Sequence, residues 1–228
     1  VATNCYGNSP FSASSSAVTP TGSASTYAST VQGDGPSIYY RLDEGSGIVA
    51  ADSSGNGRPG GYGTGGGGAY TLGAGGALVN DSDPGVSLST ALVGQANPGA
   101  GLPTGNAARS LEAWFKSTSG SPGPIMEYGF GNIKQLFDLR VPASNQLQLS
   151  TYNEGVIFIT PRGVTDGLWH HVVATYDPSN VLTMYLDGIL LGSQSFNGTL
   201  NTATPPMLPG SHGLVQRDAA WGGESGGH

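Results

Sequence analysis

Residues 169–191 constrain the fold more than any other part of the sequence. They contain three short apolar runs, namely Trp169–Tyr176, Val181–Leu186 and Ile189–Leu191. The turn-forming residues 177–180 separate the first two runs, and Asp187-Gly188 separates the last two. Asp-Gly joins neighbouring strands as a two-residue hairpin, because both positions of that turn favour positive φ. This segment therefore predicts three consecutive antiparallel strands.

The same pattern of short strands and turns continues through most of the chain. Further strands are predicted at Ile38–Leu42, Val86–Leu88, Leu111–Lys116, Gln135–Val141, Gln146–Tyr152 and Val156–Ile159. No long segment has a helical period, and only residues 25–32 are expected to form a short helical turn. The pattern predicts an all-β fold, an antiparallel β-sandwich of the jelly-roll type over residues 27–228. Residues 1–26, rich in Ser, Thr, Ala and Gly, are expected to form an extended arm or linker.

Charge and composition exclude several classes of partner. The chain of 228 residues has a formal net charge of −7, and Lys116 and Lys134 are its only lysines. So few cations do not make a basic patch, which argues against nucleic acid and anionic membranes. No apolar run reaches the length of a membrane-spanning helix, so no membrane insertion is expected. A surface rich in Ser, Thr, Gly and Asn with few lysines is typical of an extracellular protein, either secreted or at the cell surface.

Four segments in order carry a resemblance to a known family. They are Ile38–Gly47, Ala51–Gly57, Leu111–Lys116 and Asp166–Gly188. Together they resemble laminin-G-like domains, the bacterial type of concanavalin A-like lectin/glucanase jelly rolls. This resemblance covers about residues 27–210 and implies the sandwich fold. A fold of this kind carries many functions, so it does not by itself imply an activity.

The end of the chain departs from the family pattern. Members finish with a strand similar to G-x-I-D-E-V-x-I-Y, and nothing here matches it. Residues 214–221 either substitute for that strand or the strand is absent, and residues 211–228 resemble a Gly-rich tail. An absent strand would leave a sheet edge open to pairing with another chain.

The loop Asp52-Ser53-Ser54-Gly55-Asn56-Gly57 is a candidate metal site. Calcium takes six to eight oxygen ligands, and glycine allows the tight turns that direct backbone carbonyls inward. The resemblance implies calcium near one sheet edge, with Asp52 and Asn56 as ligands and Asp43 and Glu44 as contributors. The alternative is an Asx-type turn that is held by its own side chains.

Catalytic motifs are absent from the sequence. Glycoside hydrolysis needs two carboxyl groups at a defined separation, and no Glu-x-Asp-x-x-Glu or Glu-x-Asp-x-Glu occurs. Asp138 has only Arg140 two residues on, which predicts a surface ion pair. His170 and His171 are neighbours on a strand and point to opposite faces, so they are not expected to share a ligand. The sequence therefore predicts a protein that is not an enzyme.

Aromatic residues in Gly-rich sequence are candidates for stacking on sugar rings. Tyr128, Phe130 and Asn132 form the most suggestive group, and Tyr62 and Tyr70 are further candidates. The alternative is that these rings pack over the ends of the sandwich.

The sequence favours a non-catalytic extracellular binding module that recognises glycan or protein, with calcium as a candidate cofactor. The alternative is a structural subunit of an extracellular fibre, pilus-like polymer or virion appendage. Its copies would form a homo-oligomer or polymer through residues 1–26 or a donated strand.

Overall fold

The computed structural model describes residues 3–4, 7–8, 24–62, 70–78, 83–88, 93–95, 101–118, 123–152, 154–203, 212–216 and 219–221. Most of the predicted arm, residues 1–26, therefore lies outside the described residues. The division of the chain at residue 26 stays a prediction.

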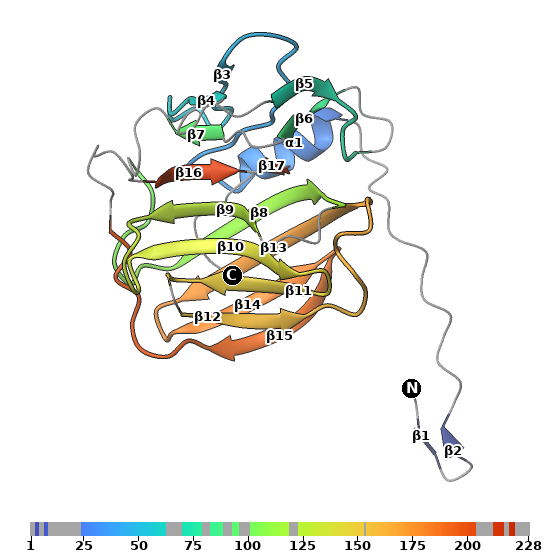
Figure 1. Ribbon diagram of the computed structural model, residues 1–228, viewed down its shortest axis with the longest axis vertical. Coiled ribbons are helices and arrows are strands. Elements are labelled where there is room, and N and C mark those ends of the chain that lie inside the picture. The colour runs from blue at the N-terminus through green and yellow to red at the C-terminus, as the bar shows by residue number, and fades with distance from the viewer. Residues whose placement is uncertain are drawn as a thin grey trace.

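One helix and seventeen short strands make up the described chain (Figure 1). In chain order they are β1 (Thr3–Asn4), β2 (Gly7–Asn8), α1 (Ala24–Gly33), β3 (Val49–Ala50), β4 (Gly60–Tyr62), β5 (Tyr70–Ala74), β6 (Gly85–Leu88), β7 (Val93–Gln95), β8 (Arg109–Lys116), β9 (Gly123–Gly129), β10 (Leu136–Ala143), β11 (Gln146–Ser150), β12 (Gly155–Ile159), β13 (Trp169–Asp177), β14 (Val181–Leu186), β15 (Ile189–Ser195), β16 (His212–Gln216) and β17 (Ala219–Trp221). Within the described ranges, no helix has the length and apolar character that crossing a bilayer requires.

Two large antiparallel sheets lie face to face. The first has eight strands in the order β12-β11-β10-β9-β16-β7-β4-β3, and the second has five in the order β15-β14-β13-β8-β17. Figure 1 shows the strands β9 to β12 of the first sheet in front of β13 to β15 of the second. This arrangement confirms the predicted antiparallel β-sandwich.

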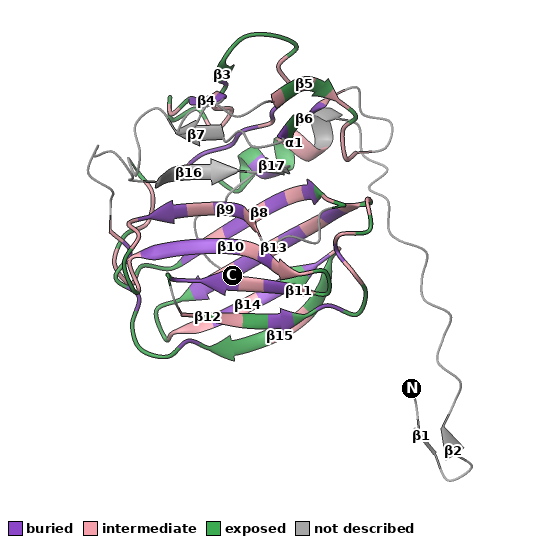
Figure 2. Cartoon of the chain, viewed as in Figure 1, coloured by how far each residue is buried: buried purple, intermediate pink, exposed green. Residues whose placement is uncertain are grey.

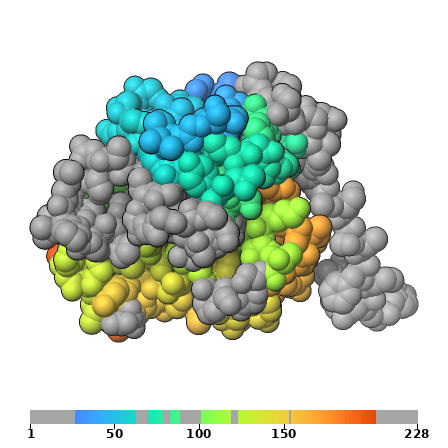
Figure 3. All heavy atoms as spheres, turned by 45° about the horizontal axis from the view of Figure 1, so that its top comes forward, coloured from blue at the N-terminus to red at the C-terminus, as the bar shows by residue number. Residues whose placement is uncertain are grey.

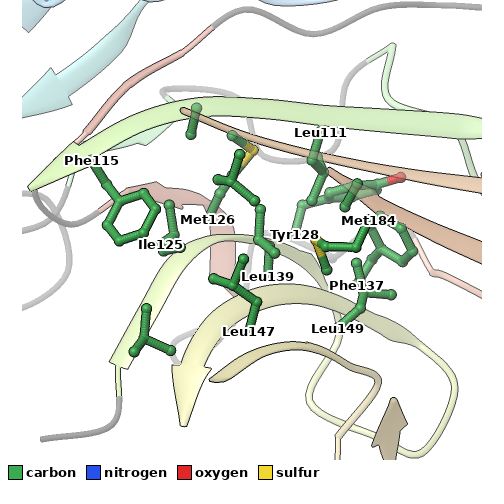
Figure 4. Close-up of a cluster of buried hydrophobic side chains, with 14 of the residues drawn as sticks. Leu111, Phe115, Ile125, Met126, Tyr128, Phe137, Leu139, Leu147, Leu149 and Met184 are labelled. Carbon is green, nitrogen blue, oxygen red and sulfur yellow. The ribbon is translucent and has the colours of Figure 1, made fainter. Parts of the chain in front are cut away.

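The core fills the space between the two sheets. Strand β8 buries Leu111, Ala113 and Phe115 and turns the residues between them outward, as its alternating sequence predicts. Figure 4 shows Leu111 and Phe115 meeting side chains of the opposite sheet, including Met126, Phe137, Leu139, Leu147 and Leu149. Figure 2 shows the resulting band of buried residues along β9, β10 and β11.

The Asp187-Gly188 hairpin forms as predicted and is tied to the core by a histidine. Asp187 and Gly188 have φ of 51° and 76°, and they join β14 to β15. The imidazole of His170 is fully buried, and it lies 3.0 Å from Asp187 through Nδ1 and 3.1 Å from Asp166 through Nε2. His171 points to the other face and contacts Glu112 at 2.8 Å. The two histidines therefore have separate, structural surroundings.

Helix α1 docks on the outer face of the five-stranded sheet through Tyr27. The Tyr27 hydroxyl donates to Oε1 of Glu112 at 2.9 Å and accepts from Nε1 of Trp114 at 3.0 Å. Both partners lie on β8, so the helix is held by polar and aromatic contacts with the centre of that strand.

The strand predicted at Ile38–Leu42 does not form. The segment makes only an isolated bridge, between Tyr40 and Asp52, and Leu42 has a positive φ of 59°. Ile38, Tyr40 and Leu42 are nevertheless fully buried. Its β-branched and aromatic residues thus reflect packing in the core rather than a place in a ladder.

The end of the chain supplies the strands that the sequence pattern lacks. β16 lies between β9 and β7 in the eight-stranded sheet, and β17 pairs with β8 in the five-stranded sheet. The described residues 212–216 and 219–221 thus each add a strand to one of the two large sheets. Within the predicted Gly-rich tail, residues 211–228, the described segments 212–216 and 219–221 form strands.

Candidate functional site: the end-loop platform

The predicted metal loop is held by its own carboxylate. Oδ1 of Asp52 accepts from the backbone N–H groups of Tyr39 and Ser54 at 3.0 Å each, and Oδ2 accepts from that of Arg58 at 2.9 Å. Burial alone would raise the pKa of Asp52, but the hydrogen bonds from Ser54, Tyr39 and Arg58 lower it overall. Asp52 thus closes an Asx-type turn.

The other three predicted ligands also have partners within the chain. Glu44 accepts from the backbone N–H of Ala51 at 2.7 Å through Oε1 and from the Tyr62 hydroxyl through Oε2. Asp43 forms an ion pair with Arg41 at 3.3 Å. The amide nitrogen of Asn56 donates to the backbone oxygens of residues 36 and 37 and to the Ser54 hydroxyl.

These groups do not fit a calcium site in the arrangement observed. Calcium needs six to eight converging oxygens, whereas the carboxylate oxygens of Asp52 and Glu44 receive hydrogen bonds from the protein. In the part of the chain that the structure describes, no three His, Cys, Asp or Glu side chains converge on one point. Calcium binding at Asp52, Asn56, Asp43 and Glu44 stays a prediction.

Tyr62 and Tyr70 lie together beside this loop. Their rings stack with centroids 5.2 Å apart, and the Tyr70 hydroxyl donates to the backbone oxygen of Gly47 at 3.3 Å. In Figure 3 the segments that carry or adjoin these residues, 27–62 in blue to cyan and 70–78 and 83–88 in teal, gather on the face turned forward. Tyr62 is buried and Tyr70 half-buried, so only Tyr70 has a ring surface left for a ligand.

Tyr128 requires a correction, because it stands in strand β9 and not in a loop. Its side chain is only 2% exposed, and it lies in the core next to Phe137. The hydroxyl accepts from Arg109 at 2.9 Å and donates to the backbone oxygen of Pro103 at 3.1 Å. A ring with no exposed face does not stack on a sugar, so Tyr128 belongs to the structural core.

Phe130 and Asn132 lie in the turn between β9 and β10, as predicted, and a second aromatic residue joins them. Tyr152, which follows β11, is 43% exposed. A methyl group added to Gly131 would lie 3.6 Å from Cε2 of Tyr152, so the tyrosine ring passes beside the turn. We call the surface formed by Phe130, Asn132, Ile133 and Tyr152 the end-loop platform.

Backbone hydrogen bonds fix the shape of the end-loop platform. The N–H of Lys134 donates to the carbonyl of Thr151 at 2.8 Å, and its carbonyl accepts from Asn201 at 2.9 Å. Lys134 and Tyr152 have φ of 64° and 66°, in the left-handed region that side chains other than glycine rarely adopt. Strained residues of this kind are concentrated at functional sites.

The platform is nearly neutral and partly apolar. Lys134 and Glu154 lie 4.0 Å apart and offset each other's charge. Ile133 is exposed beside them, and Asn132 offers an exposed carboxamide whose nitrogen contacts Gln135 at 3.3 Å. An exposed ring edged by amide groups is suited to an uncharged ligand that has both apolar faces and hydroxyl groups.

The sequence did not indicate Tyr152 as a site residue, because the strand predicted over Gln146–Tyr152 ends with it. The strand in fact stops at Ser150, and the polar residues Asn153-Glu154-Gly155 that follow are the signal of a turn. A turn at this position would have placed the tyrosine at the end of the sandwich.

A carboxylate pair was also missed, because it spans two strands. Asp138 on β10 lies opposite Glu127 on β9, and its Oδ2 is 3.1 Å from Nε of Arg140. Burial raises the pKa of Asp138 to about 7, Arg140 opposes this change and Glu127 adds to it. The expected surface pair is thus partly buried, since Asp138 is only 1% exposed. Buried to that extent, Asp138 has no contact surface for a substrate.

Known proteins share this fold. The family model described as "Concanavalin A-like lectin/glucanases superfamily" matches residues 80–224. No curated protein sequence matches the chain. Domain 4 of AbnA, a GH43 extracellular arabinanase from Geobacillus stearothermophilus solved in complex with arabinotriose, has a TM-score of 0.53 and 18% identity over 83% of this chain and 94% of that one.

Two toxin domains have a similar degree of likeness. The binding domain of Paraclostridial Mosquitocidal Protein 1 has a TM-score of 0.53 and 11% identity, covering 85% of this chain and 49% of that one. The botulinum neurotoxin serotype D binding domain has a TM-score of 0.51 and 18% identity, covering 83% and 48%. At such identities the likeness concerns the fold alone. The family match spans most of the sandwich, and the chain belongs to the concanavalin A-like lectin/glucanases superfamily.

Proposed function

We propose that this chain is a non-catalytic binding module that takes an uncharged glycan on the end-loop platform. The observation that carries the proposal is the exposed ring of Tyr152 beside the Phe130–Asn132 turn. A flat ring of this kind can cover the apolar face of a sugar, while the Asn132 carboxamide bonds its hydroxyl groups. The balanced pair of Lys134 and Glu154 favours a neutral saccharide over an anionic one.

The relative with the same fold supports this choice of ligand. The AbnA domain was solved with arabinotriose, a neutral oligosaccharide, and the alignment covers nearly all of that domain. Arabino-oligosaccharides are therefore the first probes. An extracellular location is part of the proposal, because polymeric glycans of this kind lie outside cells.

Isothermal titration calorimetry with arabinotriose, followed by a neutral glycan array, tests the proposal. Tyr152→Ala is expected to weaken binding about fivefold, since stacking on an aromatic ring is typically worth about 1 kcal/mol. Tyr185→Ala is the matched control, because Tyr185 is also exposed, at 36%, but lies on β14 in the other sheet. Equal loss in both variants, or no binding by the wild-type chain to any neutral glycan, contradicts the proposal.

The structural-subunit alternative stays a prediction, in which copies join through the arm, residues 1–26, or through a donated strand. In the described chain, β16 and β17 add a strand to each of the two large sheets. Sedimentation of the full chain and of a chain without residues 1–23 tests the role of the arm, with loss of a polymer as the supporting outcome.

A further inference from the structure

Two asparagine–glycine pairs occur in the sequence, Asn56-Gly57 and Asn197-Gly198. Both asparagines are exposed, and both glycines have a positive φ, 67° for Gly57 and 84° for Gly198. In such a pair the backbone nitrogen of the glycine can attack the side-chain amide of the asparagine, because glycine has no Cβ to hinder the approach. The chain thus holds the same reactive pair in two different surroundings.

Hydrogen bonds hold the side chain of Asn56 in place. Its amide nitrogen donates to the backbone oxygens of residues 36 and 37 at 3.0 and 3.2 Å, and to the Ser54 hydroxyl at 3.1 Å. The attack requires this amide to turn toward the nitrogen of Gly57 and to release its own nitrogen. Neither step takes place until these hydrogen bonds break, so the fold protects Asn56.

Asn197 has no such protection. Within the described ranges, neither its side chain nor the N–H of Gly198 takes part in a hydrogen bond. The pair lies in an exposed bend after β15, between the buried residues Phe196 and Leu200. A methyl group added to Gly198 would meet the end of the flexible Lys134 side chain, 2.5 Å from Nζ. The Asn197 side chain can therefore turn toward Gly198 without breaking a contact of the fold.

We propose that Asn197-Gly198 is a site of spontaneous modification, at which the asparagine becomes aspartate or isoaspartate while Asn56 stays intact. The nitrogen of Gly198 forms a bond to Cγ of Asn197, and the bond from Cγ to the side-chain nitrogen breaks. Ammonia leaves and carries away the proton of the Gly198 N–H. Water then hydrolyses the cyclic succinimide at either carbonyl group, which gives the two products. Water is the only other reactant.

The position of the site gives the modification two consequences. The new carboxylate stands beside Lys134, which lies 4.0 Å from Glu154 next to the end-loop platform. Isoaspartate also adds an atom to the backbone of the segment in which the N–H of Asn201 donates to the carbonyl of Lys134 at 2.9 Å. The modified chain therefore differs in charge and in how this segment supports the platform.

Peptide mass spectrometry of the full chain after incubation at mildly alkaline pH tests the site. In the folded chain, Asn197 is expected to react at least about tenfold faster than Asn56, because several hydrogen bonds must break at Asn56. In urea the two pairs are expected to react at similar rates, which provides the reference. The rate at Asn197 should rise with pH, because the attacking nitrogen must lose its proton.

Two variants are matched controls. Asn197→Gln keeps an amide at this exposed position but moves it away from the Gly198 nitrogen, and it is expected to stay unmodified. Ser54→Ala removes one hydrogen bond from Asn56 and is expected to raise the rate there. Equal rates at the two pairs in the folded chain overturn the proposal. So does an unmodified Asn197 in a folded chain whose two pairs both react in urea.

The effect on the end-loop platform rests on the proposed function. Ion exchange separates the modified chain by its additional negative charge, and calorimetry with arabinotriose compares the two forms. The modified form is expected to bind about fivefold more weakly, the size of one lost hydrogen bond. Asn197→Gln, incubated in the same way, should keep its affinity. Equal binding by both forms overturns the link to the platform. If neither form binds a glycan, the proposed function fails, whereas the mass spectra still decide whether Asn197 is modified.

Discussion

His170 and Asp187 are joined by a contact of 3.0 Å between Nδ1 and Oδ2, and this contact fastens the β14–β15 turn to the interior of strand β13. Burial lowers the pKa of His170, but hydrogen bonds and charge interactions with Asp187 and Asp166 outweigh it and raise the pKa above the usual 6.5. Burial would raise the pKa of Asp187, yet His170, the His171 backbone and Arg162 bring it down to about 2. The two shifts have opposite consequences for stability at high and low pH.

A window of maximum stability follows from these shifts. Because its pKa is raised on folding, protonated His170 contributes its full stabilisation below pH 6.5. This contribution is lost as the pH rises through the pKa of the folded state. Because its pKa is lowered on folding, ionised Asp187 stabilises the fold above pH 3.8. This contribution is lost as the pH falls toward 2. His170→Gln is therefore expected to cost about 2–3 kcal/mol at pH near 5 and less at pH 9. Urea unfolding at several pH values measures this, and an equal cost at all pH values contradicts it.

Asp138→Asn is expected to stabilise the protein at alkaline pH. The carboxyl group has a raised pKa of about 7, against an ordinary 3.8. Below pH 3.8 the group is protonated in both the folded and the unfolded state, and above pH 7 it is ionised in both. Between these pH values the buried charge reduces the stability of the folded state increasingly. Within the described part of the chain, its Oδ1 also has no hydrogen-bond partner. The expected gain is on the order of 1–3 kcal/mol at pH 8 and close to zero at pH 4.

Arg140→Gln is a control variant that should change the stability in the opposite direction to Asp138→Asn. Removing the guanidinium 3.1 Å from Oδ2 leaves the buried carboxylate without its cation. This variant is expected to lose stability at pH 8 and little at pH 4. Thermal unfolding at the two pH values checks both variants, and changes of the same sign in the two would be inconsistent with a charged Asp138 as the cause.

Tyr128→Ala is expected to lower the free energy of unfolding by about 3–5 kcal/mol. The ring lies in the core, and its hydroxyl accepts one hydrogen bond from Arg109, whose guanidinium lies 5.8 Å from the ring centroid. Tyr128→Phe keeps the ring and is expected to cost about 1–2 kcal/mol for the lost hydrogen bonds. Guanidinium denaturation measures both. If Tyr128→Ala instead loses glycan binding while keeping its stability, Tyr128 is part of the ligand site as the sequence predicts.

Asp52→Ala is expected to cost about 1–3 kcal/mol, because three backbone N–H groups lose their acceptor. The cost should be the same in calcium and in EDTA, since the partners of the carboxylate are protein groups. Differential scanning calorimetry in both buffers measures it. If EDTA lowers the melting temperature of the wild-type chain but not of Asp52→Ala, calcium binds at this loop as the sequence predicts.

The sequence predicts best where strand pairing is local. The segments that form β13, β14 and β15 alternate regularly and are joined by short turns, so hairpin geometry determines their register. Ile38–Leu42 has the composition of a strand but packs in the core without a ladder partner, and composition does not distinguish these two situations. β9 was overlooked because Gly123, Pro124 and Gly129 surround its few apolar residues.

The sequence predicted the residues of the candidate site less well than it predicted the fold. Glu127 and Asp138 face each other only because β9 and β10 pair in one register, which includes an irregularity between Leu139 and Arg140. Phe130 and Asn132 were placed correctly because the glycines around them indicate a turn. Tyr152 adopts a left-handed φ that depends on the neighbouring loop, and no residue-level pattern indicates this.

The position of β16 also has a consequence for biosynthesis. Among the described strands, β7, β4 and β3 join the rest of the eight-stranded sheet only through β16, which pairs with β9 on its other side. These three strands lie within residues 49–95, whereas β16 consists of residues 212–216. On a ribosome the early strands therefore wait until more than a hundred further residues have been made. Their docking therefore waits for the synthesis of β16, and until then a chaperone that shields them has its longest opportunity to act.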